Sequence, residues 1–384
     1  MKTLRIALFT YSTKPRGGVI HTLELAEALQ EAGQEVCIYA LDKDNIGFHR
    51  PLKCPSKLVP TQPAADSIDK LIEQRIAEFI DYLSNETDKY DIYHSQDCIS
   101  ANALKVLRDQ QMIPSFLRTV HHIDDFNSPY LQECHDRSIQ EPDLCLCVSQ
   151  YWQEQLQQQY KVSAPVIING INTQRFSSDA NGSERELKQR LGITGDHVYL
   201  SIGGIEPRKN SLRLLQAFSQ ILKVHPQAQL VIAGGETLFD YQPYRNEFFT
   251  IAKQHQIHLG ESLLLPGVMS DQDIPVLYRC ADAFVFPSVK EGWGLVLLEA
   301  IASGLPVITS NIAPFTEFLS SQQALLVKPH SSNAIAQAML DILDKNLAQQ
   351  LIRNSKAIPS QYSWQKSAQI HLKLYQKLKQ DARN

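Results

Sequence analysis

The chain has 384 residues, of which 43% are hydrophobic and 20% charged, and its formal net charge is −4. This length exceeds one ordinary hydrophobic core, so two domains are expected. The slightly acidic balance argues against nucleic-acid binding, which needs a basic stripe, and no apolar run reaches the roughly 18 residues of a membrane-spanning helix.

Strands and helices are expected to alternate along the first half of the chain. Its strands are expected at residues 4–11, 35–41, 92–94, 116–121 and 144–148. Amphipathic helices are expected at residues 22–32 and 66–83, with Asp66 as the cap of the second. This alternation predicts an α/β domain whose parallel sheet is covered on both faces.

The same rhythm starts again in the second half. Its strands are expected at residues 198–203, 229–233, 262–265, 283–286 and 306–309. Its helices are expected at residues 211–224, 274–280, 295–303 and 332–343. Two doubly wound, Rossmann-like domains in tandem are therefore predicted, and their strand ends are expected to face a common cleft where ligands bind.

The domain limits follow from composition. The polar, turn-rich stretch at residues 177–183 is the best linker candidate. We expect a first domain at residues 1–172, a second domain at residues 173–360, and a final helical segment at residues 361–384. The first domain has a net charge of −7 and the remainder +3, which argues against docking on anionic lipid and suits an anionic small ligand in the second half.

Seven scattered cysteines without a CxxC pair predict buried, reduced thiols and a soluble cytoplasmic protein.

A glycine-containing loop follows the first strand of each half. Gly17 and Gly18 come after Lys14-Pro15-Arg16 and before a helix, where bare backbone N–H groups could meet a phosphate. A plain tight turn is the alternative. In the second half, Gly203 and Gly204 precede the adjacent cations Arg208 and Lys209, whose fork and point charge both suit phosphate oxygens. A solvated charge pair is the alternative there.

The most specific signal runs from residue 287 to residue 300. Glu291 lies in a loop, Gly292 and Gly294 bare amides at a helix start, and Glu299 lies more than one turn into that helix. Two carboxylates beside a phosphate seat would repel the phosphate unless they meet other groups. Sugar hydroxyls are natural partners, because carboxylates accept strong hydrogen bonds from them.

Residues 291–308 resemble the signature of family-4 retaining glycosyltransferases of the GT-B fold, E-G-F-G-x-x-x-x-E-A-x-A-x-G-x-P-V, with Trp293 in place of the usual Phe. Further likenesses extend along the whole chain. They are Gly17-Gly18, Thr119-Val120-His121, Asn169-Gly170-Ile171-Asn172 with Phe176, and the stretch from Gly267-Val268-Met269-Ser270-Asp271 through Leu277-Tyr278 and Ala281-Asp282 to Pro287-Ser288.

The resemblance implies that residues 1–172 form an acceptor-side domain, that residues 173–360 form a nucleotide-sugar-binding domain, and that the helix of residues 361–384 crosses back to the first domain. It implies a role for each matching residue as well. It implies that Glu299 holds the donor ribose, that Glu291 holds the transferred sugar, and that Arg208 and Lys209 neutralise the leaving diphosphate. It also implies that His121 lies beside the transferred sugar. The resemblance further implies that Gly17, Gly18 and Gly203 bind the donor and that Asp97 and His122 lie on the acceptor side. It implies that the backbone of Val268 contacts the nucleotide base. The amides implied to contact the sugar and diphosphate are those of Gly292, Trp293, Gly294 and Leu295.

This sequence departs from the family pattern at one position. The family has an arginine after the glycine of the second phosphate loop, and Gly204 stands there instead. Either Arg208 supplies that charge or the donor phosphate is held less strongly. The missing arginine favours one alternative, a catalytically impaired sugar-nucleotide-binding subunit. A GT-B nucleotide-sugar epimerase or phosphorylase and a peripheral membrane enzyme with a lipid acceptor also stay open.

The expected reaction moves a hexose-type sugar from a nucleotide-diphosphate sugar to an acceptor hydroxyl, with retention as the resemblance implies. No cofactor is expected, and no DxD motif stands at a strand end to hold a metal. Asp42-Lys43-Asp44 has that spacing but is expected to be a surface loop. The expected partners are the donor and an acceptor that the sequence does not name.

Overall fold

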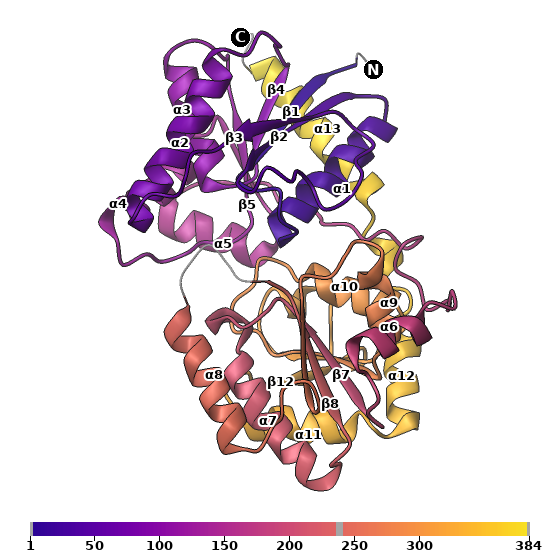
Figure 1. Ribbon diagram of the computed structural model, residues 1–384. Coiled ribbons are helices and arrows are strands. Elements are labelled where there is room, and N and C mark those ends of the chain that lie inside the picture. Colours follow the sequence, from indigo (N-terminus) through magenta and orange to yellow (C-terminus); the bar gives the residue numbers. More distant parts are fainter. Residues whose placement is uncertain (1–2, 236–240, 382–384) are drawn as a thin grey trace. The chain divides into compact units, whose positions relative to one another are not determined.

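The computed structural model describes residues 3–235 and 241–381, and the chain divides into two compact units (Figure 1). Unit 1 comprises Met1–Gly170 and Tyr362–Asn384, and unit 2 comprises Ile171–Gln361. The polar stretch at residues 177–183, expected to be the linker, therefore lies within unit 2. There Ser178 packs so closely that a Cβ added at Gly304 would lie 2.9 Å from the Cβ of Ser178.

Unit 1 is built on a six-stranded sheet in the order β3-β2-β1-β4-β5-β6. The strands are β1 (Arg5–Thr10), β2 (Glu35–Asp42), β3 (Ser56–Pro60), β4 (Ile92–Ser95), β5 (Leu117–Val120) and β6 (Leu144–Cys147). Every pairing is parallel. The strand order reverses between β1 and β4, so the loops that leave these two strands flank the position where doubly wound sheets bind ligands.

Helices flank this sheet. They are α1 (Gly17–Glu31), α2 (Ile68–Ser84), α3 (Cys98–Asp109), α4 (Pro129–Gln140), α5 (Gln150–Tyr160) and α13 (Trp364–Asp381). Helix α2 is capped by Ser67, whose hydroxyl accepts from the Lys70 N–H at 3.4 Å, so the predicted Asp66 cap is wrong. The hydroxyl of Ser67 stands at the N-cap itself and can reach the third helical N–H group.

The C-terminal helix α13 belongs to unit 1 although it follows unit 2 in the chain. It lies beside α1, the yellow helix next to the indigo one in Figure 1. Its buried face includes Trp364, Leu372 and Tyr375. Trp364 fits against Gly170, where an added Cβ would lie 2.3 Å from the Trp364 nitrogen, and Lys379 pairs with Asp91 at 2.5 Å.

Unit 2 repeats the same architecture with the strand order β12-β11-β10-β7-β8-β9. The strands are β7 (Val198–Ile202), β8 (Gln229–Ala233), β9 (Leu263–Gly267), β10 (Ala283–Phe286), β11 (Val307–Ser310) and β12 (Leu325–Val327), all parallel. The order reverses between β7 and β10. The tandem of two parallel, doubly wound sheets expected from the sequence is confirmed.

The helices of unit 2 are α6 (Glu184–Leu191), α7 (Ser211–Val224), α8 (Gln242–Gln254), α9 (Asp273–Arg279), α10 (Leu295–Ala302), α11 (Ser332–Asp341) and α12 (Lys345–Ser355). The described residues of unit 2 also form three short 3-10 turns: η1 (Pro207–Lys209), η2 (Phe315–Glu317) and η3 (Pro359–Gln361).

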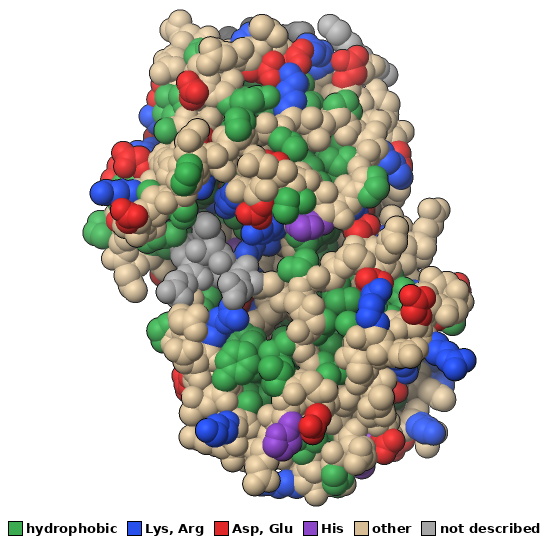
Figure 2. Space-filling model, viewed as in Figure 1, with side chains coloured by type: hydrophobic (Ala, Val, Ile, Leu, Met, Phe, Trp, Pro, Cys, Tyr) green, Lys and Arg blue, Asp and Glu red, His purple; other side chains and the backbone are tan. Residues whose placement is uncertain are grey.

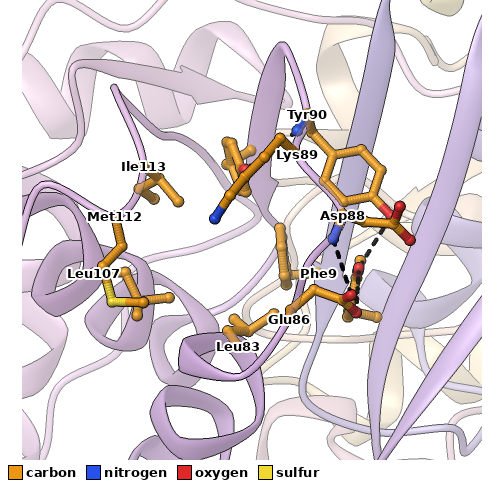
Figure 3. Close-up of a pocket in the computed structure, with 11 residues that line it drawn as sticks. Phe9, Leu83, Glu86, Asp88, Lys89, Tyr90, Leu107, Met112 and Ile113 are labelled. Atoms are coloured by element: carbon orange, nitrogen blue, oxygen red, sulfur yellow. Dashed lines mark hydrogen bonds between the residues drawn. The ribbon is translucent and has the colours of Figure 1, made fainter.

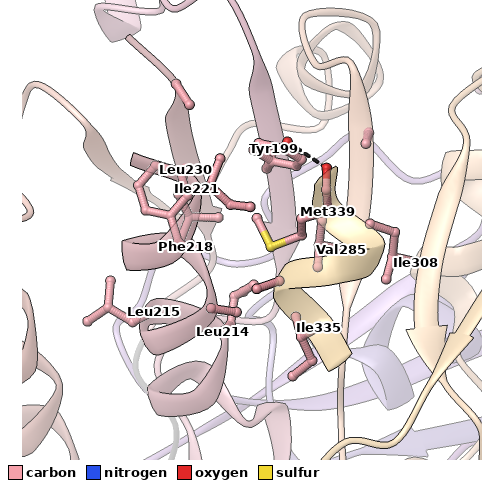
Figure 4. Close-up of a cluster of buried hydrophobic side chains, with 14 of the residues drawn as sticks. Tyr199, Leu214, Leu215, Phe218, Ile221, Leu230, Val285, Ile308, Ile335 and Met339 are labelled. Carbon is pink, nitrogen blue, oxygen red and sulfur yellow. Dashed lines mark hydrogen bonds between the residues drawn. The ribbon is translucent and has the colours of Figure 1, made fainter. Parts of the chain in front are cut away.

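The core of unit 2 lies between the sheet and helices α7 and α11. Phe218 of α7 and Met339 of α11 are fully buried beside Tyr199 of β7 (Figure 4). The Tyr199 hydroxyl donates to the Met339 carbonyl at 2.8 Å, so this buried polar atom is satisfied. Burying one such large apolar side chain stabilises the fold by about 1.5–3 kcal/mol, and this core fixes the strands whose ends carry the site.

Candidate active site

The loop after β7 brings two backbone segments into close contact. The N–H groups of Gly203 and Gly204 both donate to the Ala233 carbonyl, at 2.8 and 3.2 Å. Both glycines have positive φ, +129° and +78°, and a Cβ added at Gly204 would lie 2.9 Å from the Gly235 carbonyl oxygen. A side chain at position 204 would therefore be strained and blocked by backbone, which is the physical reason that glycine stands there.

A charged cluster forms where η1 meets the loop after β10. The Lys209 ammonium donates to Glu291 Oε1 at 2.5 Å, and the Arg208 guanidinium donates to the same oxygen at 3.0 Å. The Ser288 hydroxyl donates to it at 3.1 Å. Arg208 also pairs with Glu206 at 3.1 Å. Two of the residues predicted to be catalytic, Arg208 and Lys209, thus converge on the carboxylate of a third, Glu291.

In this cluster, the two cations favour the ionised form of Glu291, and Glu291 favours the charged form of Lys209. Burial alone would raise the pKa of Glu291, but attraction to Lys209 and Arg208 outweighs burial and lowers the pKa. Burial, with the charge of Arg208, lowers the pKa of Lys209, and Glu291 opposes this change. The ammonium also lies 4.5 Å from the centre of the Phe286 ring. The cluster thus holds a largely buried Lys209 and a 36% exposed Arg208 on one carboxylate, and cations positioned in advance in this way can stabilise charge during catalysis.

Helix α10 begins next to this cluster. Its N-cap is Gly294, with φ +108° and no side-chain cap, and a Cβ there would lie 2.9 Å from the Phe315 ring. Trp293 stacks on Phe318 with ring centres 4.8 Å apart, which anchors the preceding segment. The first amides of a helix, here starting with Leu295, carry partial positive charge and can receive an anion.

The remaining donor-side residues of unit 2 lie on neighbouring elements. The Tyr278 hydroxyl donates to Glu299 Oε2 at 2.7 Å, which orients this carboxylate from α9. Val268 follows β9 directly and is 51% exposed, and its side chain lies against Gly235. Gly292 lies in the loop between Glu291 and Trp293. The residues predicted from the second half of the chain therefore follow β7, β9 and β10 in unit 2, except Glu299, which lies within α10.

In unit 1, the start of α1 lies beside His121. The helix begins at Gly17, so Gly17 and Gly18 form its first turn. The prediction that they lie in a loop before a helix that starts at residue 22 is therefore wrong. A Cβ at Gly18 would be 3.7 Å from the His121 ring, whereas one at Gly17 would meet nothing within 4 Å. The His121 Nε2 atom hydrogen-bonds Gln96 at 3.1 Å, and the ring packs edge-on against His21 at 4.8 Å.

The two predicted acceptor-side residues have local structural partners. Asp97 caps α3 by accepting from the Ser100 N–H at 2.8 Å, and burial raises its pKa. His122 Nε2 lies 2.9 Å from Asp124. Asp42, expected at the surface, is buried and accepts from the Gly47 N–H at 3.1 Å. Its carboxylate closes the turn after β2.

Sequence reasoning missed Gln96 and Phe315. Gln96 follows β4 immediately, at the sheet edge where ligands bind, and that position was the signal available for it. Phe315 lies in η2, far from any motif that the sequence analysis used. Among the described residues, no group of three or more His, Cys, Asp or Glu side chains could hold a metal ion, and no helix is long and apolar enough to cross a membrane.

Two surface features lie apart from these residues. A pocket of unit 1 has Tyr90, Glu86 and Asp88 on one side and Leu107 and Met112 on the other (Figure 3), and no predicted site residue lines it. On the face shown in Figure 2, acidic and basic side chains are interspersed over each unit without a broad basic stripe.

Comparisons with known proteins cover both halves of the chain. The family model described as Glycosyltransferase Family 4 matches residues 15–175, and the one described as Glycosyl transferases group 1 matches residues 183–358. An uncharacterized glycosyltransferase of Methanocaldococcus jannaschii is 26% identical, with 97% of this chain and 98% of that protein covered.

Two solved structures have the same fold. Sucrose-phosphate synthase from Thermosynechococcus elongatus superposes with a TM-score of 0.79 at 24% identity, covering 98% of this chain and 99% of that one. The Anabaena HepE protein in complex with UDP-glucose superposes with a TM-score of 0.78 at 18% identity, covering 97% and 100% of the two chains.

Proposed function

The chain belongs to the group 1 glycosyltransferases and has the GT-B fold, and on that premise we propose that it transfers a hexose from a nucleotide-diphosphate sugar to an acceptor hydroxyl, with retention and without a metal ion. The observation that carries the proposal is the convergence of Lys209 and Arg208 on Glu291, beside the start of α10. The cluster joins two cations for a diphosphate to a carboxylate for sugar hydroxyls.

Each charge in the cluster has a task during transfer. As the bond between the sugar C1 and the diphosphate oxygen breaks, its electron pair leaves negative charge on the distal phosphate. Lys209 and Arg208 are fixed to meet that charge, and the α10 amides add partial positive charge. Glu291 keeps the cations in place and accepts hydrogen bonds from the sugar, while Glu299, oriented by Tyr278, accepts from the ribose.

The acceptor closes the proton balance. Its hydroxyl oxygen forms the new bond to C1, and its proton passes to the departing phosphate oxygen on the same face of the sugar. The family resemblance is the ground for proposing that His121 lies beside the transferred sugar, and its partly exposed ring next to Gly18 supports that role. Retention rests on membership of the family, whose reaction this is.

None of the seven cysteines, all of which the structure describes, forms a disulfide, and six of them are buried. Thiols outside disulfides favour a reducing compartment, so we propose that the protein acts in the cytoplasm.

A binding test comes first. Wild type is heated with UDP, GDP or ADP, and one of these should raise Tm, because a ligand that binds only the folded state stabilises it. The shift should shrink in Lys209→Ala and persist in Lys253→Ala, a control on the exposed face of α8. No stabilisation by any nucleoside diphosphate would refute the donor site.

A turnover test follows with the matching nucleotide sugars, in excess EDTA, with products analysed by mass and by anomeric configuration. Transfer or donor hydrolysis should persist, and the transferred sugar should keep its configuration. Loss of turnover that Mn²⁺ restores would refute the metal-free mechanism. Binding without turnover would favour an impaired subunit, and an isomerised nucleotide sugar would favour an epimerase.

A further inference from the structure

A chain of hydrogen bonds runs through the interior of unit 1 from His121 to helix α13. His121 Nε2 bonds Gln96 Oε1 at 3.1 Å, and Gln96 Nε2 bonds His94 Nε2, also at 3.1 Å. The Thr119 hydroxyl bonds the same His94 nitrogen at 2.8 Å, and His94 Nδ1 bonds the Tyr375 hydroxyl at 2.8 Å. His94, Thr119 and Tyr375 are fully buried, so water does not complete their hydrogen bonds.

The two histidines of this hydrogen-bond network, His94 and His121, are neutral. Burial, and then the nearby histidines His371, His21 and His121, holds the pKa of His94 well below its usual range. Burial, and then His21, His122 and Arg118, does the same to His121. A neutral imidazole has one N–H donor and one bare nitrogen, so each hydrogen bond in the chain has a fixed direction.

The direction of one bond dictates the next. With its amide oxygen toward His121, Gln96 accepts, so the proton of His121 is on Nε2. Its amide NH₂ then faces a bare His94 Nε2, which also accepts from Thr119, and the His94 proton on Nδ1 is donated to Tyr375. If the amide turned over, every donor and acceptor from Tyr375 to His121 would have to reverse. Gln96 is thus the junction between the buried network and His121.

We propose that Gln96 is a positioning residue that holds His121 as the Nε2–H tautomer and so presents a bare Nδ1 to the substrate. Among the described residues, His121 Nδ1 has no hydrogen-bond partner, and the ring is partly exposed. A bare imidazole nitrogen accepts a hydrogen bond from a sugar hydroxyl, whereas the other tautomer would present an N–H. This proposal rests on the proposed function, in which His121 lies beside the transferred sugar.

The tautomer can be measured without any turnover. In ¹⁵N-histidine-labelled full-length protein, the His121 signals, assigned by their loss in His121→Asn, should show a protonated Nε2 and a bare Nδ1. In Gln96→Ala the acceptor of the His121 Nε2 proton is gone, so the His121 signals should change toward Nδ1–H. In Gln158→Ala, an exposed change on α5, they should keep the wild-type pattern. A wild-type Nδ1–H signal, or an unchanged tautomer in Gln96→Ala, would overturn the proposal.

Kinetics separate positioning from a merely structural effect. Gln96→Ala should lower kcat by on the order of 10- to 100-fold with donor KM nearly unchanged, as for a misplaced contact. Gln96→Glu puts a carboxylate beside His121 and should raise its pKa, so activity should fall on the acid side about one pH unit higher than in wild type. Gln158→Glu, exposed on α5, is the charge-matched control and should keep the wild-type profile.

An unshifted pH profile in Gln96→Glu with wild-type Tm would refute the positioning role. If wild type turned over no nucleotide sugar, the proposed function would fail, whereas the NMR result on the tautomer would still stand or fall by itself.

Discussion

Replacing Gly204 by arginine, the residue that the family has there, should damage unit 2 rather than supply a missing cation. The left-handed conformation at φ +78° costs a residue with a side chain about 1–2 kcal/mol. The Gly235 carbonyl, 2.9 Å from the added Cβ, is backbone and cannot move aside freely. Such overpacking costs about 1–3 kcal/mol more. Gly204→Ala and Gly204→Arg should therefore each cost about 2–5 kcal/mol, the sum of these ranges.

A second glycine isolates the two contributions. Gly260 in unit 2 has φ +83°, and a Cβ there would meet nothing within 4 Å. Gly260→Ala should therefore cost only the conformational part, about 1–2 kcal/mol. The assay is urea unfolding of the full chain, with hydrogen exchange of peptides from β7 and β8 reporting on unit 2. If Gly204→Ala costs no more than Gly260→Ala, the steric argument is wrong.

Three further predictions concern charge, the last helix and pH. Arg208→Ala and Lys209→Ala should each lower kcat by on the order of 10²-fold, the effect of losing one preorganised charge stabiliser; wild-type turnover in Arg208→Ala would make that arginine a surface residue. Truncation after Pro359 removes α13, so hydrogen exchange should accelerate within residues 1–170, and unchanged protection there would contradict the packing of α13. Burial lowers the pKa of His371 to about 3. Below about pH 6.5 the unfolded chain therefore binds a proton at His371 that the native state does not bind. The free energy of unfolding should fall by about 1.4 kcal/mol per pH unit as the pH drops from there toward 3. Urea unfolding of wild type and His371→Leu should be compared between pH 7 and pH 5. The loss of unfolding free energy per pH unit should be smaller in the variant by about 1.4 kcal/mol. Equal losses in the two proteins would contradict the prediction.

The sequence predicted the strands of the sheet centres well because they are short apolar runs between turn signals. It missed β3 and β12. In β3 only Val59 is buried, so the strand carries little hydrophobic pattern and is held by backbone pairing with β2. The start of α1 was also placed late, because Gly17 and Gly18 read as a loop when helix propensity alone is considered.

The candidate residues of unit 2 could be named from the sequence because strand ends, glycines and charged residues lie together in short motifs. The unit 1 network was not, since its bonds join residues far apart in the chain: His94 and Tyr375 are 281 positions apart. Likewise the sequence raised Gly204 as a missing charge, whereas the reason for glycine, the carbonyl of Gly235, comes from a neighbouring strand end. Local patterns identify candidate residues, and only tertiary contacts show which partners orient them.

The split composition of unit 1 has a consequence for biosynthesis. On the ribosome, residues 1–170 emerge long before α13, and all of unit 2 is made in between. Until α13 arrives, His94 lacks its Tyr375 partner and the Trp364 seat beside Gly170 is open to water. Unit 2 can thus complete its core during translation, whereas unit 1 cannot complete its core until α13 has been synthesised. The side of the molecule that carries His121 is therefore the last to mature, and it is during this interval that chaperones would find exposed apolar surface on the nascent chain.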